Sequence, residues 1–266
     1  MRYIFMLLFL CSGVSTAIDN AVPGVRSAAL RESNIAGKTT TGQFLVNPAL
    51  SAYAEHLIID TWHSRLFGLK ELPLSGGSLI LPNETVNIGL SIQHFGHSLY
   101  QEMMLTANLS RAWESGIHAG GNLRYLRTDV QRYGNSSLFS LDAGFIYDVF
   151  TCLRFGGSIS NMNHPAVNKF GEELSPIIRF GCAYDPADNA TVYLAVQKDG
   201  AFQPEVSMGM EISPVESFTF FSGVLLNDVK PAAGILVKIK RVQMNYALQH
   251  HFELGATHVA GLSFVK

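Results

Sequence analysis

The chain has 266 residues, enough for one large domain or two modest ones. Hydrophobic residues make up 47% of it and charged residues only 15%, which is low beside the usual quarter. The formal net charge is −2, which excludes the basic footprint of a nucleic-acid-binding protein. Beyond residue 17, no apolar run reaches the roughly 18 residues that a membrane helix needs. This composition fits either a membrane β-barrel or a well-buried soluble β-protein.

The first 17 residues, MRYIFMLLFLCSGVSTA, predict a cleaved secretory signal peptide. Arg2 precedes a short apolar stretch, and Ser15 and Ala17 occupy the small-residue positions of a cleavage site. Cys11 offers a lipoprotein alternative, which the large residues just before it disfavour.

Residues 18–50 are rich in Ala, Gly, Ser and Thr and show little alternation. The stretch NPALSAYAE at 47–55 predicts a short helix, with Asn47 as its cap and Pro48 in its first turn. We therefore treat residues 18–55 as a segment apart from the rest of the chain.

From residue 56 onward, apolar and polar residues alternate, as in a β-strand with one apolar and one polar face. In TVNIGLSIQ at 85–93, for example, the apolar set is Val86, Ile88, Leu90 and Ile92, and the small or polar set is Asn87, Gly89, Ser91 and Gln93. The rhythm predicts about fourteen strands, at 56–64, 70–81, 84–96, 99–112, 115–128, 137–148, 151–160, 175–185, 190–199, 203–213, 216–226, 231–239, 241–249 and 256–265.

Charged residues recur in mid-strand on the polar face. A charge facing lipid costs about 2–4 kcal/mol at the bilayer midplane, so in a membrane barrel this face must line the lumen. We expect these charges to form a satisfied interior network or to hold the N-terminal segment, with a solute pathway as the alternative. The candidates are Arg124, Asp142, Arg154, Arg179, Glu205, Glu211 and Lys238.

The connections between predicted strands differ in length according to whether they are odd- or even-numbered along the chain. The three longest, at 129–136, 161–174 and 250–255, all fall in the odd-numbered set, while tight turns fall in the even-numbered set. Outer-membrane barrels alternate long loops and short turns in this way, whereas a soluble sandwich has no reason to do so. The order favours a barrel with both termini on the periplasmic side. Aromatic residues near strand ends are candidates for interfacial girdles, namely Tyr100, Trp113, Tyr133, Tyr147, Tyr184 and Phe218.

Little in the chain predicts catalysis or metal binding. Cys152 is in phase with a polar face and Cys182 with an apolar face, so we expect two free thiols rather than a disulfide. The adjacent His250 and His251 would point to opposite faces of a strand, which makes a poor metal site. No nucleophile motif such as G-x-S-x-G is present. We predict no catalytic residue, cofactor or metal, with an outer-membrane lipase as a minor alternative.

Four stretches together resemble outer-membrane proteins of the PorV/PorQ type, relatives of the long-chain fatty-acid transporter barrels. One of them, FSLDAGFIYDVFTCLRFGGSISNM, looks like the stretch of these proteins that ends in a short loop-opening Asn. NPAL at 47–50 resembles their NPAG opening, with Leu50 in place of Gly. LPLSGGSLILPNETVNIGLSIQHFG is similar to their second and third strands, and YALQHHFELGATHVAGLSF to their closing hairpin.

This resemblance implies an all-β, up-and-down transmembrane barrel of about fourteen strands at 56–266. It also implies that residues 18–55 form a hatch tucked inside the barrel, with Asn47 and Pro48 as its motif. The family further implies a place in the type IX secretion apparatus, where such barrels bind partner subunits or secreted cargo.

Two functions are consistent with the sequence. The first is a non-enzymatic outer-membrane barrel that binds secretion-system subunits or cargo proteins. The alternative is an outer-membrane transporter for hydrophobic or small solutes, gated by residues 18–50. In both, the chain lies in the outer membrane of a Gram-negative-type bacterium, contacts membrane lipid and binds no nucleic acid. A soluble exported β-protein is the weaker third hypothesis.

Overall fold

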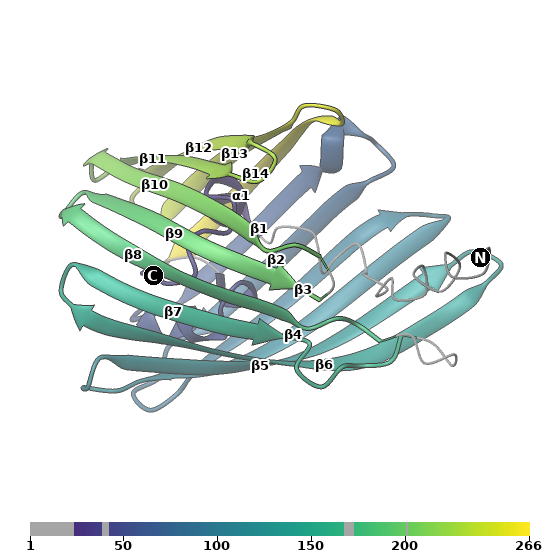
Figure 1. The fold of residues 1–266 in the computed structure, drawn as a ribbon, viewed down its shortest axis with the longest axis horizontal. Coiled ribbons are helices and arrows are strands. Elements are labelled where there is room, and N and C mark those ends of the chain that lie inside the picture. The colour runs from purple at the N-terminus through teal and green to yellow at the C-terminus, as the bar shows by residue number, and fades with distance from the viewer. Residues whose placement is uncertain (1–23, 39–42, 168–172, 201) are drawn as a thin grey trace, which may run out of the picture.

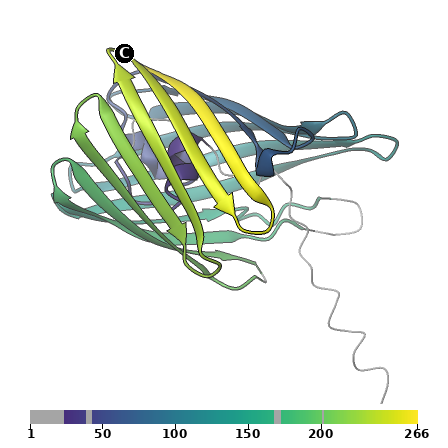
Figure 2. The same cartoon turned by 90° about the horizontal axis from the view of Figure 1, so that it is seen from above.

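Fourteen antiparallel strands close into a single barrel in the computed structural model, which describes residues 24–38, 43–167, 173–200 and 202–266 (Figures 1 and 2). Each strand pairs with the next along the chain, and β1 pairs with β14 from Ile58↔Val265 to Arg65↔His258. The strands are β1 (Ile58–Arg65), β2 (Pro73–Leu81), β3 (Asn87–His97), β4 (Tyr100–Ala112), β5 (Ile117–Val130), β6 (Gly134–Phe150), β7 (Leu153–Ser160), β8 (Ile177–Ala187), β9 (Ala190–Asp199), β10 (Glu205–Val215), β11 (Phe218–Leu225), β12 (Lys230–Ile239), β13 (Val242–His251) and β14 (Gly255–Val265). The predicted number of strands and the up-and-down barrel are confirmed.

The alternation in the sequence separates the outside of the barrel from its inside. In β3, Asn87, Ser91 and Gln93 are buried, while Ile88, Leu90 and Ile92 are 40–51% exposed. Most exposed large side chains of the other strands are likewise apolar, and most of their buried polar side chains lie in the interior. The interior also takes some large apolar side chains, among them Trp62, Leu74 and Ile80, which pack beside the N-terminal segment or near the ends of the strands. A sheet with an apolar outer face and a polar inner face is the arrangement of a membrane barrel, and closure leaves no strand edge unpaired in lipid.

Aromatic side chains mark one rim of this apolar surface. Trp113, Tyr147, Tyr184 and Phe218 are all exposed, and each lies close to a short turn at the same end of the barrel. Such rings prefer the boundary between hydrocarbon and water. The closed sheet and its rimmed apolar surface identify the chain as an outer-membrane barrel.

Within the described residues, no helix combines the length and apolar character needed to cross a membrane.

The two ends of the barrel differ in their connections. The turn end carries the turns 82–86, 113–116, 151–152, 188–189, 216–217 and 240–241 together with the end of β14, and the loop end carries the other seven connections. The longest connection, 161–176, lies at the loop end as predicted. The predictions for 129–136 and 250–255 are wrong, because these are the tight turns 131–133 and 252–254. Polar strand ends there continue to pair, as in Asp129↔Asn135 and His251↔Gly255.

Residues 24–38 and 43–55, here called the N-terminal segment, lie within the barrel (Figures 1 and 2). The segment contains helix α1 (Val25–Ala29) and the 3₁₀ turns η1 (Gln43–Leu45) and η2 (Pro48–Tyr53); a third such turn, η3 (Leu66–Gly68), follows β1. Several of its side chains are completely buried, among them Leu30, Ile35, Phe44 and Leu50. The predicted signal peptide at 1–17 lies outside the described residues.

The two cysteines of the described chain, Cys152 and Cys182, are free. Cys152 lies in the turn between β6 and β7, and Cys182 lies on β8. Both side chains are half-buried.

Candidate functional site

The second part of the N-terminal segment, residues 43–55, is bound to the barrel wall by uncharged amide groups. The side-chain amides of Asn122 and Asn108 donate to the carbonyl oxygens of Phe44 and Pro48, both at 3.0 Å. Asn87 on β3 donates to the carbonyls of Ser51 at 2.8 Å and Ala54 at 3.0 Å. Inward-facing asparagines on neighbouring strands thus satisfy a backbone that is neither helix nor sheet, which buried backbone requires.

Asn47 links the two parts of the segment. Its side-chain oxygen accepts from the Ala49 N–H at 3.1 Å and caps η2, with Pro48 in the first turn as the sequence pattern predicts. Its side-chain nitrogen donates to the Ile35 carbonyl at 2.8 Å and to the Phe145 carbonyl of β6 at 3.2 Å. One side chain therefore holds the cap, the first part and the wall in register.

The first part, residues 24–38, is bound mainly by charged groups. Arg26 of α1 forms an ion pair with Glu211 of β10, and Tyr193 of β9 bonds both partners. Arg154 of β7 donates to the Ala36 carbonyl at 3.0 Å. Its other two nitrogens form a bidentate pair with Asp185 of β8 at 2.6 and 2.9 Å.

Two further arginines complete this set at the loop end. Arg179 of β8 lies 3.5 Å from the Glu32 carboxylate and donates to Gln197 at 2.7 Å. Arg31 donates to the carbonyl oxygens of Pro231 at 3.1 Å and His250 at 3.0 Å. Ion pairs and backbone carbonyls on β7 to β13 thus fasten the first part to one half of the barrel.

Glycines on the inner wall let the segment approach the strands at backbone distance. A Cβ at Gly223 would lie 2.6 Å from the Ala29 carbonyl oxygen, and one at Gly156 would lie 2.9 Å from that of Ile35. Neither is a distance that a real side chain tolerates, so only glycine fits. We call the set the glycine collar; its members are Gly89, Gly120, Gly144, Gly156, Gly181, Gly209, Gly223, Gly234 and Gly261.

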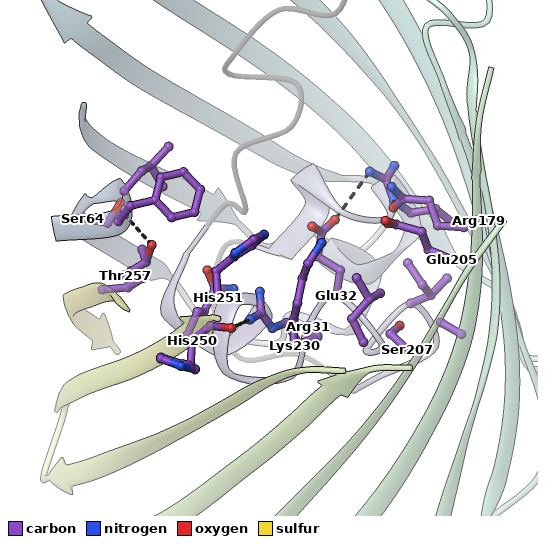
Figure 3. A pocket seen from close by; sticks show the side chains of 18 of the residues that line it. Arg31, Glu32, Ser64, Arg179, Glu205, Ser207, Lys230, His250, His251 and Thr257 are labelled. Carbon is purple, nitrogen blue, oxygen red and sulfur yellow. Dashed lines mark hydrogen bonds and ion pairs between the residues drawn. The ribbon is translucent and has the colours of Figure 1, made fainter. Parts of the chain in front are cut away.

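A cavity of about 340 Å³ lies on the loop side of the first part (Figure 3). Its floor is formed by Arg31, Glu32 and Ile35 of the N-terminal segment. Its walls come from η3 and from strands β1, β8 to β13 and β14. The size falls at the lower end of the range of small-molecule sites, about 300–1,000 Å³. We call this the loop-side cavity.

A second cavity, of about 460 Å³, lies on the opposite side of the first part, and we call it the turn-side cavity. Arg26 and Lys38 of the segment face it together with Arg154, Asp185 and Glu211. Lys38 is 4.0 Å from Asp185 and more than half exposed. Residues 24–38 thus separate two hollows that belong to opposite ends of one lumen.

The predicted lumen charges fall into three groups. Arg124 and Asp142 form a buried pair at 2.9 Å, with Asn161 bonded to Arg124 at 2.6 Å. Arg154, Arg179 and Glu211 contact the first part. Glu205 lines the loop-side cavity, and Lys238 is exposed near the turn end of β12.

Burial shifts the ionisation of two groups in the segment. Burial lowers the pKa of the Arg31 guanidinium, opposed by the nearby carboxylates of Glu32 and Glu205. Burial also raises the pKa of the Tyr53 phenol well above its ordinary value, and the Asp148 carboxylate, which accepts its hydrogen bond at 2.5 Å, raises it further. Tyr53 therefore stays protonated and serves as a donor.

No cluster of three or more His, Cys, Asp or Glu side chains suited to a metal ion occurs among the described residues. His250 and His251 both line the loop-side cavity. The His251 ring accepts from the Glu253 and Leu254 backbone N–H groups at 3.3 Å.

Among the solved structures with a similar fold are a monoaromatic hydrocarbon channel and a toluene transporter. The monoaromatic hydrocarbon channel CymD matches with a TM-score of 0.70 at 12% identity, over 91% of this chain and 97% of that one. The Pseudomonas putida toluene transporter TodX matches with a TM-score of 0.65 at 10% identity, over 91% and 97%. No protein-family model matches the chain, and none of the curated proteins does.

At these identities the likeness shows the fold, a fourteen-stranded outer-membrane barrel of the kind used by channels. The neighbours are channels rather than enzymes. Membership of the PorV/PorQ family is not confirmed, and a role in type IX secretion finds no support among them.

Sequence reasoning missed the glycine collar and the partners of the N-terminal segment. A signal for the collar was present, because its glycines share the polar, lumen-facing phase of their strands. Arg26 carried no such signal, since its partner Glu211 lies 185 residues away.

Proposed function

We propose that this chain is an outer-membrane channel that admits small solutes of hydrophobic character. The observation that carries the proposal is the division of one lumen into a loop-side and a turn-side cavity by residues 24–38. A solute that enters at the loop end reaches the first cavity and stops at the N-terminal segment. The structural neighbours, channels for toluene and monoaromatic hydrocarbons, support the same class of solute.

In this proposal the N-terminal segment is a plug whose two parts behave differently. Asparagine amides and the cap at Asn47 hold residues 43–55, and no charge has to be separated to keep them there. Residues 24–38 lie between the two cavities and are bound by ion pairs and by arginine bonds to backbone carbonyls. The charged partners line the two cavities, so water there can solvate them when the pairs part. Movement of the first part would join the cavities, while the second part stays on the wall.

A reversible tether tests the proposal directly. A Cβ at Gly209 would lie directly against the Ser33 hydroxyl, so cysteines at these two positions are close enough to form a disulfide. The double variant S33C/G209C, made without the native cysteines, is expressed in cells whose outer membrane excludes toluene. Initial uptake of labelled toluene is then measured.

Uptake by the parent protein is expected to exceed that of cells without it, to fall to background in the oxidised double variant, and to return on reduction. The single variant S33C, which cannot form the tether, serves as the matched control. Uptake by the tethered form equal to that of the control would refute passage across residues 24–38. A parent protein that raises no uptake would refute the channel itself.

The binding of secretion-system subunits or cargo by the exposed loops stays a prediction.

A further inference from the structure

The loop-side cavity has two chemically different sides. The β1 and β14 side of the barrel is uncharged and contributes Leu66, Phe67 and Val259 together with the hydroxyls of Ser64 and Thr257. Arg179 and Glu205 come from β8 and β10, which lie across the lumen from β14 and β1 in the strand order. Figure 3 shows the uncharged Ser64 and Thr257 at one side of the cavity and the charged Arg179 and Glu205 at the other. A ligand that fills this space meets an uncharged, partly apolar surface at one end and charged groups at the other.

The charges around the cavity balance one another. Arg179 faces Glu32 at 3.5 Å, and Lys230 is paired with Asp228 at the rim at 2.8 Å. Arg31 and Glu205 are the remaining opposite charges, and Glu205 attracts both Arg31 and Lys230. A charged ligand would leave water for a wall without a spare counter-charge, which is unfavourable. The balance therefore favours a ligand that is uncharged.

One strong acceptor in this wall is unused. Among the described residues, none donates a hydrogen bond to the Glu205 carboxylate, although its side chain is only partly exposed and lines the cavity. The Arg31 guanidinium is occupied by two backbone carbonyls, and Arg179 by Gln197, Ser160 and Glu32. An uncharged group that donates a hydrogen bond, such as a hydroxyl, satisfies this carboxylate without disturbing the pairs around it.

We propose that the loop-side cavity selects a small ring compound that carries an uncharged hydroxyl, with its ring against Phe67 and Val259 and its hydroxyl donating to Glu205. The inference rests on the channel function proposed above and narrows its solute from plain hydrocarbons to phenol-like or alcohol-like molecules. A hydrocarbon of the same shape fills the apolar side but leaves the Glu205 carboxylate without a donor. Discrimination against it follows from that unpaired acceptor.

The test compares four probes of one ring size: p-cresol, toluene, p-toluate and 4-methylbenzylammonium. Binding to the full-length protein in lipid nanodiscs is measured by equilibrium dialysis, with empty nanodiscs subtracted for partition into lipid. We expect p-cresol to bind about 10- to 100-fold more tightly than toluene, as a hydrogen bond to a charged acceptor gives. Both charged probes are expected to bind more weakly than p-cresol.

Substitutions on the hairpin of β10 and β11 test whether Glu205 causes the preference for p-cresol. E205L removes the acceptor and is expected to bring p-cresol down to the affinity of toluene, with toluene binding unchanged. E205Q keeps a neutral acceptor of nearly the same shape and is expected to retain a reduced preference, which covers the case in which E205L fails to fold. E216L changes an exposed glutamate in the turn after β10, at the opposite end of the barrel, and is expected to leave the preference intact.

The outcomes are distinct. Equal affinities for p-cresol and toluene, or tightest binding of either charged probe, would overturn the selection of a hydroxyl while leaving the channel standing. A preference that survives E205L would overturn the role of Glu205. Failure of all four probes to bind, together with no toluene uptake in cells, would overturn the channel function itself.

Discussion

A single methyl group at Gly223 is expected to loosen the N-terminal segment from the barrel wall. In Gly223→Ala the new Cβ would lie 2.6 Å from the Ala29 carbonyl oxygen and 2.8 Å from the Leu30 Cα. Both are backbone atoms of the first part, so no side-chain rotation relieves the overlap. The stretch around α1 must move away from β11.

The size of the effect follows from two opposing quantities. Overpacking a well-filled interior costs about 1–3 kcal/mol. Docking of the first part buries Leu30 and Ile35 completely, which stabilises it by about 1.5–3 kcal/mol for each side chain. The penalty is smaller than the docking energy, so the variant stays mostly docked. Its undocked population is expected to rise about 5- to 150-fold, the factor that corresponds to about 1–3 kcal/mol.

The undocked population can be read from the reactivity of one buried thiol. Ser27 is completely buried on α1, so Ser27→Cys in a chain with Cys11, Cys152 and Cys182 replaced by serine reacts with maleimide only when the first part undocks. The rate should rise by the factor above when Gly223→Ala is added. Gly121→Ala is the matched control, because Gly121 faces outward and its Cβ would meet its nearest neighbour at an ordinary 3.4 Å. An unchanged rate in a folded Gly223→Ala barrel would refute the close docking of α1.

Three other outcomes follow from the same geometry. Arg154→Met breaks the bidentate pair with Asp185 and removes the donor to the Ala36 carbonyl, so it should lower the free energy of unfolding by about 1–3 kcal/mol. Adding Asp185→Asn should recover part of this loss, and denaturant titration of the folded barrel measures both values. Leu90→Arg places a charge on the lipid face of β3 and should destabilise the barrel in bilayers by about 2–4 kcal/mol. The control Thr85→Arg, at an exposed position in the turn before β3, should leave the stability unchanged, and equal effects of the two variants would contradict the outward orientation of the Leu90 side chain. Asn122→Leu removes the donor to the Phe44 carbonyl and should lower the free energy of unfolding by about 1–3 kcal/mol. Amide hydrogen exchange should then become faster in residues 43–55 than in β3, and unchanged exchange would argue against anchoring by the asparagine amides.

The sequence alone determined the strands, their faces and the membrane they cross. Alternation is a local property, because successive side chains of a strand point to opposite sides whatever the strand pairs with. Ile88 and Ser91 could therefore be assigned to lipid and lumen before any contact was known, and the structure agrees. Mid-strand charges such as Arg124 and Asp142 indicated which face lines the lumen, because a charged side chain that faces lipid is energetically unfavourable. Strand ends were harder to predict, because residues beyond the apolar belt continue to pair up to the turns at 131–133 and 252–254.

Only the tertiary structure decided what fills the lumen and where space remains. Arg26 finds Glu211, and Asn122 finds the Phe44 carbonyl, because closure of the sheet brings strands far apart in the chain around one segment. The glycine collar acquires its meaning in the same way, since a glycine in a strand reveals nothing about the backbone packed against it until that backbone is in place. The two cavities are the space that remains after many strands and one buried segment have packed together, and in one of them the Glu205 carboxylate accepts no hydrogen bond from any described residue. No local sequence pattern predicts the size or the lining of these cavities, because both depend on how all the surrounding strands and the N-terminal segment pack together.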